Sequence, residues 1–399
     1  MPSWCNKANA YTSAWCLYYL QGTLYSVGSF FSQLLLAILL LVSLYYCFVA
    51  NVRYKLPIYF WGLNALVLIL STYGLFLMFG GFNSVEYDMP VKSFEYLKGV
   101  FSSLLPIYSF YVFFVQKKVS DNYLFVWVVI FLLVSTVDYF ENQNAQLIAA
   151  IQRHSSAEEF TNNAGYKFLA LIPACALLYK KPVIQYIIVV YCTIYMLMSM
   201  KRGAIVICGV VLIWFVWNNI KNSRVMMKIG FVALSLVLCI TCYEFIQNKM
   251  ENSLYFQKRI ENTLDGNSSG RDVLYNSLAN YFWNETTSMQ FIFGSGANAT
   301  LQVVGDYAHN DWLEIAVNQG VLGLLVYVIY WMLFCKTIKS SSLSPYAKLA
   351  LQILFMIYFL KSLFSMSYGA MAISATFVLG YCLAQISKGN KKITIKNEF

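Results

Sequence analysis

Charged residues are scarce in this sequence, and histidines are scarcer still. Asp, Glu, Lys and Arg make up 12% of the 399 residues, whereas 59% are hydrophobic and only two are histidine. An average soluble domain carries about 25% charged residues, so the composition excludes an ordinary water-soluble fold. The sequence also lacks a His, Cys and carboxylate cluster with zinc spacing, internal repeats and Pro-rich linkers. We therefore expect a single domain, residues 1–399, with no metal and no cofactor.

Long apolar stretches fill most of the chain instead. A membrane-spanning helix needs about 20 mainly apolar residues, because lipid offers no partners for backbone N–H and C=O groups. The sequence predicts an all-α polytopic membrane protein with about eleven (10 to 12) spanning helices. These are expected near residues 28–50, 57–80, 97–115, 122–139, 164–179, 182–200, 203–218, 227–247, 319–337, 347–367 and 369–386.

The connections between the apolar stretches and the N-terminal residues give three further expectations. The short connections within 164–200 and within 347–386 predict two helical hairpins. No charged segment followed by a cleavage site opens the chain, so no removable signal peptide is expected. Residues 1–27 are aromatic and poor in charge, which favours either an interfacial segment or an extra helix.

Basic residues alternate between loops, and this pattern predicts the orientation in the membrane. Short loops rich in Lys and Arg stay in the cytoplasm. Only two of the 18 acidic residues, Asp121 and Glu398, fall in these loops, and the tail 387–399 is assigned to the cytoplasm with them. The net charge of +10 then reflects membrane topology and not nucleic-acid binding. The basic residues of this set are Arg53, Lys55, Lys117, Lys118, Lys180, Lys181, Lys221, Arg224, Lys228, Lys336, Lys339, Lys348, Lys388, Lys391, Lys392 and Lys396.

The largest segment on the opposite side is predicted at residues 248–318. Long ordered loops usually carry function, so we expect the active site there. A second outer segment is predicted at 140–163, where part of the chain has the composition of a surface helix.

A histidine lies at the end of the large loop. His309 and Asn310 are followed by nine residues and then by the run GVLG, in which Gly320 and Gly323 are expected to let the next span pack closely. Asp311 and Glu314 resemble a capping box at a helix start, and Leu313, Ala316 and Val317 share one helical face. An imidazole at this boundary can accept a proton at neutral pH. The alternative is a loop histidine bonded to nearby backbone.

The spacing H-N-x9-G-x-x-G resembles the motif of the O-antigen polymerase and O-antigen ligase family. Two other stretches are similar to that family: GSGAN at Gly294–Asn298, and Lys201-Arg202-Gly203, which resembles its Ser-Arg-Gly segment. The family's ligases carry R-x3-L in the large loop, whereas Arg271 here has its leucine one position closer. Arg259 is therefore an alternative to Arg271, although the Ser-Gly-Arg context favours Arg271.

The resemblance implies a glycosyltransferase whose donor is an oligosaccharide on undecaprenyl diphosphate. His309, Arg202 and Arg271 are the implied catalytic residues, because arginine binds phosphate oxygens in pairs and histidine can act as a base. Lys361 stands in an apolar span, where it either reaches the outer interface or faces a phosphate. The further substrate-binding candidates are Arg259, Asn310, Glu314, Lys201 and Lys361.

The expected function is that of an O-antigen polymerase in the bacterial inner membrane, with its active site facing the periplasm. Its expected partners are a lipid-linked donor and acceptor, membrane lipid and a chain-length regulator protein, but no nucleic acid. A ligase that transfers the glycan to lipid A core would use the same residues. A lipid-linked glycan transporter is a more distant alternative, since such proteins usually show repeated halves, and a structural or receptor membrane protein is another.

Overall fold

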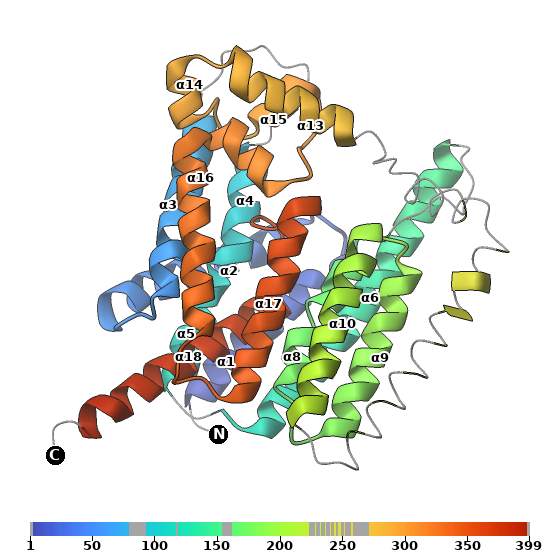
Figure 1. Ribbon diagram of the computed structural model, residues 1–399, viewed down its shortest axis with the longest axis vertical. Coiled ribbons are helices and arrows are strands. Elements are labelled where there is room, and N and C mark those ends of the chain that lie inside the picture. The colour runs from blue at the N-terminus through green and yellow to red at the C-terminus, as the bar shows by residue number, and fades with distance from the viewer. Residues whose placement is uncertain are drawn as a thin grey trace. The chain divides into compact units, whose positions relative to one another are not determined.

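Helices make up every regular element in the part of the chain that the structure, a computed structural model, describes (Figure 1). That part comprises residues 3–79, 93–116, 119–153, 162–222 and 271–396, with isolated residues between 228 and 257. Seven helices there are long and apolar enough to cross a membrane. The predicted all-α class is thereby confirmed for this part of the chain, with seven candidate spans, while the number eleven stays a prediction. The seven are Phe30–Arg53, Tyr59–Met78, Phe94–Gln116, Asp121–Ile148, Arg202–Lys221, Asp311–Ile338 and Pro345–Phe364.

The chain divides into two compact units. The first comprises residues 1–37, 118–268 and 345–357, and the second comprises residues 38–117, 269–344 and 358–399. Two helices, α2 (Phe30–Arg53) and α17 (Pro345–Phe364), contribute to both units.

The first unit departs from the predicted spans in several places. Residues 164–179 were expected to form one span, but they form two short helices, α7 (Gly165–Leu169) and α8 (Ile172–Ala176). Pro173 lies in the first turn of α8, and its missing N–H favours a new helix start there. The apolar helical stretch from Gly165 to Ala176 is too short to cross a bilayer alone.

Other elements of this unit differ in length from the prediction. The helix α6 (Asp121–Arg153) runs on well past residue 139, so the outer segment predicted from residue 140 begins inside a helix. The helix α9 (Pro182–Met198) is short, and α10 (Arg202–Asn222) is long enough to span. At the N-terminus Ser3–Tyr19 form the helix α1, which is not one of the seven candidate spans, so the choice between an interfacial segment and an extra span stays a prediction. The span predicted at 227–247 lies outside the described residues, apart from isolated positions.

The second unit is built around α3 (Tyr59–Met78) and α16 (Asp311–Ile338). The Tyr59 and Tyr330 hydroxyls are hydrogen-bonded at 2.8 Å. At Gly62 a Cβ would come within 2.9 Å of the Tyr330 Cα, so glycine permits the close approach of the two helices. Next to them, α18 (Ile373–Lys396) packs on α5 (Pro106–Gln116). The span predicted at 97–115 corresponds to the candidate span Phe94–Gln116, which comprises α4 (Ser93–Leu104) and α5, since Pro106 begins a new helix within it.

Much of the predicted large loop is helical. Residues 248–270 lie outside the described part, except for isolated positions. From residue 271 the chain forms α13 (Arg271–Asn280), the π-helix η1 (Tyr281–Glu285), α14 (Ser288–Phe293) and α15 (Ala299–Val304). Figure 1 shows these elements together at one end of α3 and α16. A small core holds them on the first turns of α16; it consists of Leu278, Phe282, Ala299, Ala308, Ala316 and Val317.

The elements α13, η1, α14 and α15 are called the helical cap below. The cap contacts α16 at a break in that helix. Gly320 has φ 66° and ψ −163°, so α16 is interrupted there. The interruption leaves two carbonyl groups available, and they accept backbone hydrogen bonds from the glycine-rich stretch: Ser295 N–H to Val317 O at 2.9 Å and Gly296 N–H to Asn318 O at 3.0 Å. A Cβ on Gly320 would lie 2.5 Å from the Gly294 N and the Ile292 O. Gly320 therefore permits a close approach of the chain at Ile292 and Gly294, whereas the predicted close packing of the following span stays a prediction.

Candidate active site

His309 ends the irregular segment that precedes α16. Its φ of 50° is a left-handed backbone conformation, uncommon for residues other than glycine but enriched in Asn, Asp and His. The side chain is 41% exposed, and its Nε2 lies 3.8 Å from the Asp306 Oδ2. The backbone of His309 is held from another helix, because the Tyr275 hydroxyl on α13 donates to the His309 carbonyl at 3.3 Å. The imidazole is thus accessible while its backbone is anchored.

Asn310 begins α16 as its N-cap. The Asn310 Oδ1 accepts from the backbone N–H groups of Trp312 at 2.9 Å and Leu313 at 3.2 Å. The predicted cap at Asp311 is therefore wrong by one residue. An N-cap needs an extended backbone and a side-chain acceptor directed at the first turn, and Asn310 supplies both with φ −153° and ψ 115°.

Asn310 also joins α16 to the end of α17, where Arg271 binds as well. The Asn310 Nδ2 donates to the Leu363 carbonyl at 3.2 Å, and the Arg271 Nη1 donates to the Phe364 carbonyl at 2.8 Å. Carbonyl groups at a helix C-terminus lack partners within the helix and carry partial negative charge, so a cation is favourable there. The structure therefore brings together three of the predicted residues, Arg271, His309 and Asn310.

Tyr275 completes this group, which we call the α17-end cluster: Arg271, Tyr275, His309 and Asn310. Burial raises the pKa of the Tyr275 phenol, although Arg271 acts in the opposite direction. The phenol therefore stays a neutral donor at physiological pH. The sequence prediction missed Tyr275, although its position four residues after Arg271 places both on one face of a helix.

The two acidic residues of the motif are buried and accept hydrogen bonds from the protein itself. Glu314 accepts from the Thr300 hydroxyl at 2.7 Å, from the Asn318 Nδ2 at 2.9 Å and from the Ala308 N–H at 2.8 Å. Ala308 directly precedes His309, so Glu314 fixes the backbone beside the imidazole. This burial favours a positioning role over the substrate contact predicted for Glu314.

Asp311 and Lys361 anchor the connection between α17 and α18. Asp311 accepts from the Ser367 N–H at 2.9 Å, from the Tyr327 hydroxyl at 2.6 Å and from the Ser367 hydroxyl. Lys361 is buried, and its Nζ donates to the Ala370 carbonyl at 3.3 Å. The Lys361 ammonium group is thus covered by the protein, and the two predicted roles, reaching the outer interface or facing a phosphate, stay predictions.

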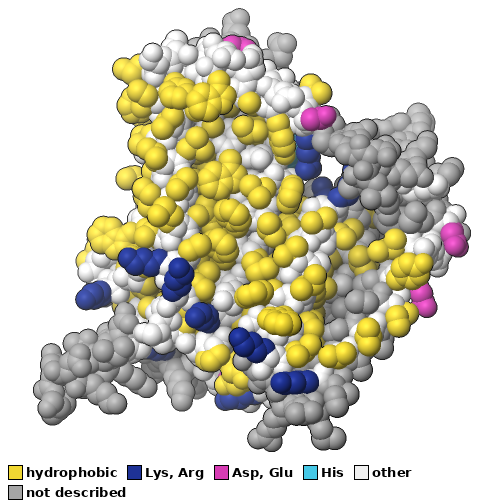
Figure 2. Space-filling view, in the orientation of Figure 1, with side chains coloured by type: hydrophobic (Ala, Val, Ile, Leu, Met, Phe, Trp, Pro, Cys, Tyr) yellow, Lys and Arg dark blue, Asp and Glu magenta, His cyan; other side chains and the backbone are white. Residues whose placement is uncertain are grey.

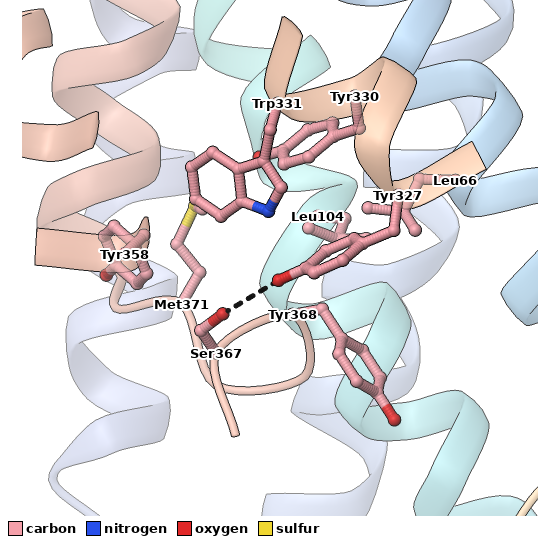
Figure 3. A pocket seen from close by; sticks show the side chains of 9 residues that line it. All are labelled: Leu66, Leu104, Tyr327, Tyr330, Trp331, Tyr358, Ser367, Tyr368 and Met371. Atoms are coloured by element: carbon pink, nitrogen blue, oxygen red, sulfur yellow. Dashed lines mark hydrogen bonds between the residues drawn. The ribbon is translucent and has the colours of Figure 1, made fainter. Parts of the chain in front are cut away.

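A small aromatic pocket lies beside this connection. Figure 3 shows the Tyr327 hydroxyl directed toward the Ser367 hydroxyl, with Trp331 and Met371 next to them. The two hydroxyls are 3.4 Å apart. Because Tyr327 also binds Asp311, the pocket belongs to the support of the α17–α18 connection. Its other lining residues are Leu66, Leu104, Tyr330, Tyr358 and Tyr368.

Arg202 and Lys201 belong to the first unit. Arg202 is the first residue of α10, and Lys201 precedes it. Two hydrogen bonds hold the junction between α9 and α10. The Tyr139 hydroxyl on α6 donates to the Met198 carbonyl at 3.2 Å, and the Asn162 N–H, just before α7, donates to the Ser199 carbonyl at 2.8 Å. Nearby on α6 and α7, Asp138 and Lys167 form an ion pair at 2.6 Å. Arg259 lies outside the described residues.

Side chains that could bind a metal ion are dispersed over the part of the chain that the structure describes. Among the described residues, no three His, Cys, Asp or Glu side chains are grouped as metal ligands would be. The chemical groups offered by the α17-end cluster are one imidazole, one guanidinium group, one phenol and one amide. These groups can bind an anion and accept or donate a proton.

Comparison with known proteins finds a match to a family described as O-antigen ligase. Its family model matches residues 187–328, a range that contains Arg202, Arg271 and His309. The resemblance predicted from the motifs is therefore confirmed for this part of the chain. No curated protein matches the sequence. The family match and the apolar helices together indicate a multi-pass membrane protein with O-antigen ligase or polymerase-type glycosyltransferase activity.

Proposed function

We propose that this protein is an O-antigen (surface polysaccharide) polymerase. It would transfer a growing glycan from undecaprenyl diphosphate to the non-reducing end of a lipid-linked repeat unit. The observation that carries the proposal is the α17-end cluster, in which an accessible histidine and an arginine meet within the segment that matches the family. The reaction would take place at the periplasmic face of the bacterial inner membrane.

The chemistry of this transfer needs a base at the acceptor. A sugar hydroxyl of the acceptor attacks the anomeric carbon of the donor, and the bond from that carbon to the diphosphate oxygen breaks. The diphosphate leaves with the electron pair, and the hydroxyl proton passes to the His309 imidazole. A side-chain base within hydrogen-bond reach contributes about 100- to 10,000-fold in rate. His309 is suited to this role because its side chain is accessible and its backbone is fixed on both sides.

The leaving group needs positive charge. We propose that Arg271 binds the diphosphate, since a guanidinium group grips phosphate oxygens in pairs and each charge-assisted hydrogen bond is worth about 1.5 to 3 kcal/mol. Arg271 donates to the Phe364 carbonyl, so binding the donor would exchange a carbonyl acceptor for a phosphate. Arg202 stays a proposed second ligand of the diphosphate on the resemblance alone. No metal ion is part of this proposal.

Glu314 and Asp311 would act indirectly in this scheme. Glu314 holds the Ala308 N–H beside His309, and Asp311 holds Ser367 in the α17–α18 connection. Both carboxylates would fix the geometry of the cluster without touching the substrate. We therefore propose them as positioning residues.

The ligase is the second candidate, and it is favoured by the description of the matching family. The Arg271 spacing, which departs from the ligase-type R-x3-L, favours the polymerase. Lipopolysaccharide from a deletion strain distinguishes the two activities. Single repeat units on lipid A core would support the polymerase, whereas bare core with accumulated lipid-linked polymer would show a ligase. Normal lipopolysaccharide would contradict both.

A further inference from the structure

The short helix α14 (Ser288–Phe293) presents an apolar face that the described part of the chain leaves exposed. Met289, Ile292 and Phe293 are exposed at spacing i, i+3 and i+4, which places them on one side of the helix. Met289 is 70% exposed, and Trp283 in the preceding η1 is 68% exposed. Four large apolar side chains thus point away from the protein within eleven residues.

The opposite face of α14 is fixed to the protein, so the exposed face has a defined direction. Phe291 stacks on Phe282 with ring centroids 5.0 Å apart. The helix start is held by a capping box between Thr287 and Gln290. At the helix end, Tyr73 of α3 donates its hydroxyl hydrogen to the Phe293 carbonyl, and the following residues are bonded to α16. A rotation of α14 that buried the apolar face would break these contacts.

The exposed face continues the lipid-facing surface of the spanning helices. Phe293 is attached to the last turns of α3, where Phe76, Met78 and Phe79 are also exposed. In Figure 2 hydrophobic side chains extend over the second unit from α14 along the face formed by α3 and α16. Residues 273–304 contain no Lys or Arg, and their only acid is Glu285. Tryptophan and other aromatic side chains are enriched at the boundary between lipid and water.

We infer that the Met289, Ile292 and Phe293 face of α14, together with Trp283, is embedded in the interfacial region of the lipid bilayer. A contiguous exposed apolar patch marks a membrane or protein contact, and continuity with the spanning helices selects the membrane. An amphipathic helix at such a boundary buries its apolar face in the headgroup and acyl region. The contact would fix the depth of the 294–310 segment, and thus of His309, relative to the membrane surface.

Photo-crosslinking in lipid nanodiscs tests this inference on the full chain. A diazirine-bearing phenylalanine replaces Met289 in one variant and Ile292 in a second. In the matched control it replaces Ser277, an exposed polar position on α13. After irradiation, mass spectrometry counts the protein molecules that carry a covalently attached phospholipid. We expect several-fold more lipid adducts at positions 289 and 292 than at position 277.

Two outcomes would overturn the inference. Lipid adducts at positions 289 and 292 no more frequent than at position 277 would place α14 in water. Crosslinks between protein copies at position 289 would assign the face to a second copy of the chain. The experiment measures lipid adducts and not glycan transfer. A negative result would therefore refute the lipid contact without refuting the proposed function, and a failure of the proposed function would leave the lipid contact intact.

Discussion

Asn310 shows how one side chain can connect two helices of the candidate active site. The side-chain Oδ1 accepts hydrogen bonds from the first turn of α16, and the side-chain Nδ2 donates to the Leu363 carbonyl at the end of α17. The adjacent residue, His309, supplies the imidazole. The position of His309 and Asn310 at a helix start was predictable from sequence, because polar residues precede an apolar periodic run. The assignment of the cap to Asp311 failed, since the Asp311 carboxylate has partners 56 residues away at Ser367. Local pattern cannot show which of two adjacent polar residues finds a distant partner.

Replacing His309 tests base catalysis directly. His309→Ala should lower glycan transfer by about 100- to 10,000-fold, because a positioned base is lost. His309→Gln keeps a hydrogen-bonding group but cannot accept a proton, so it should be nearly as slow. Polymer formation from lipid-linked repeat units by purified protein gives the rate, and protein level and thermal stability serve as controls. Near-normal transfer by His309→Gln would reduce the role to orientation, and near-normal transfer by His309→Ala would make the residue structural.

The Arg271→Lys variant tests whether Arg271 acts through its positive charge alone or also through the planar geometry of its guanidinium group. Lysine keeps the positive charge near the α17 carbonyls but loses the planar fork that binds two phosphate oxygens. We expect the variant to retain its thermal stability and to lose most of its transfer activity at limiting donor concentration. Arg202→Lys should behave similarly if it too binds the diphosphate. Full activity in both variants would exclude the arginine clamp, and the alternative Arg259 should then be tested.

At the scale of elements, hydropathy found most helices but misplaced several ends. The helix that carries the span predicted from residue 319 begins at Asp311 and is interrupted at Gly320. Its first turns contain four polar side chains, those of Asp311, Glu314, Asn318 and Gln319. These residues lower the mean hydropathy of the segment, yet all four side chains are buried. Their partners come from Thr300, Ala308, Ser367 and Tyr96. Burial of such groups depends on tertiary hydrogen bonds, so no local average could have predicted it.

The break at Gly320 offers an element-scale prediction. Gly320→Ala should destabilise the protein by at least about 2 kcal/mol, since it adds a left-handed strain of about 1 to 2 kcal/mol to a backbone clash near 2.5 Å. Thermal unfolding in detergent measures the change. The control is Gly209→Ala in α10, where nothing lies within 4 Å of the new methyl group and alanine improves helix propensity by up to about 1 kcal/mol. Equal unfolding temperatures in the two variants would contradict the role of Gly320.

At the scale of the whole molecule, the distribution of basic residues predicts sidedness. A reporter enzyme fused at residue 290 should be active only outside the cytoplasm, whereas a fluorescent reporter fused at residue 395 should fold in the cytoplasm. Both fusions can be scored in intact cells, and immunoblots control for expression. The opposite result at both positions would move the cap and His309 to the cytoplasmic side. The proposed periplasmic reaction would then have to be abandoned.

The backbone bridge between the glycine-rich stretch and α16 has a consequence for solvent exchange. Ser295 and Gly296 lie outside any helix, yet their amide hydrogens are donated to Val317 and Asn318 in the interior of the unit. An amide in such a bond exchanges with deuterium only when the segment opens. We expect these two amides to exchange as slowly as the first turns of α16, and much more slowly than the amide of the exposed residue Asp306. Deuterium-exchange mass spectrometry on overlapping peptides can measure this contrast, and fast exchange at both bridge amides would show that α16 and the cap open independently.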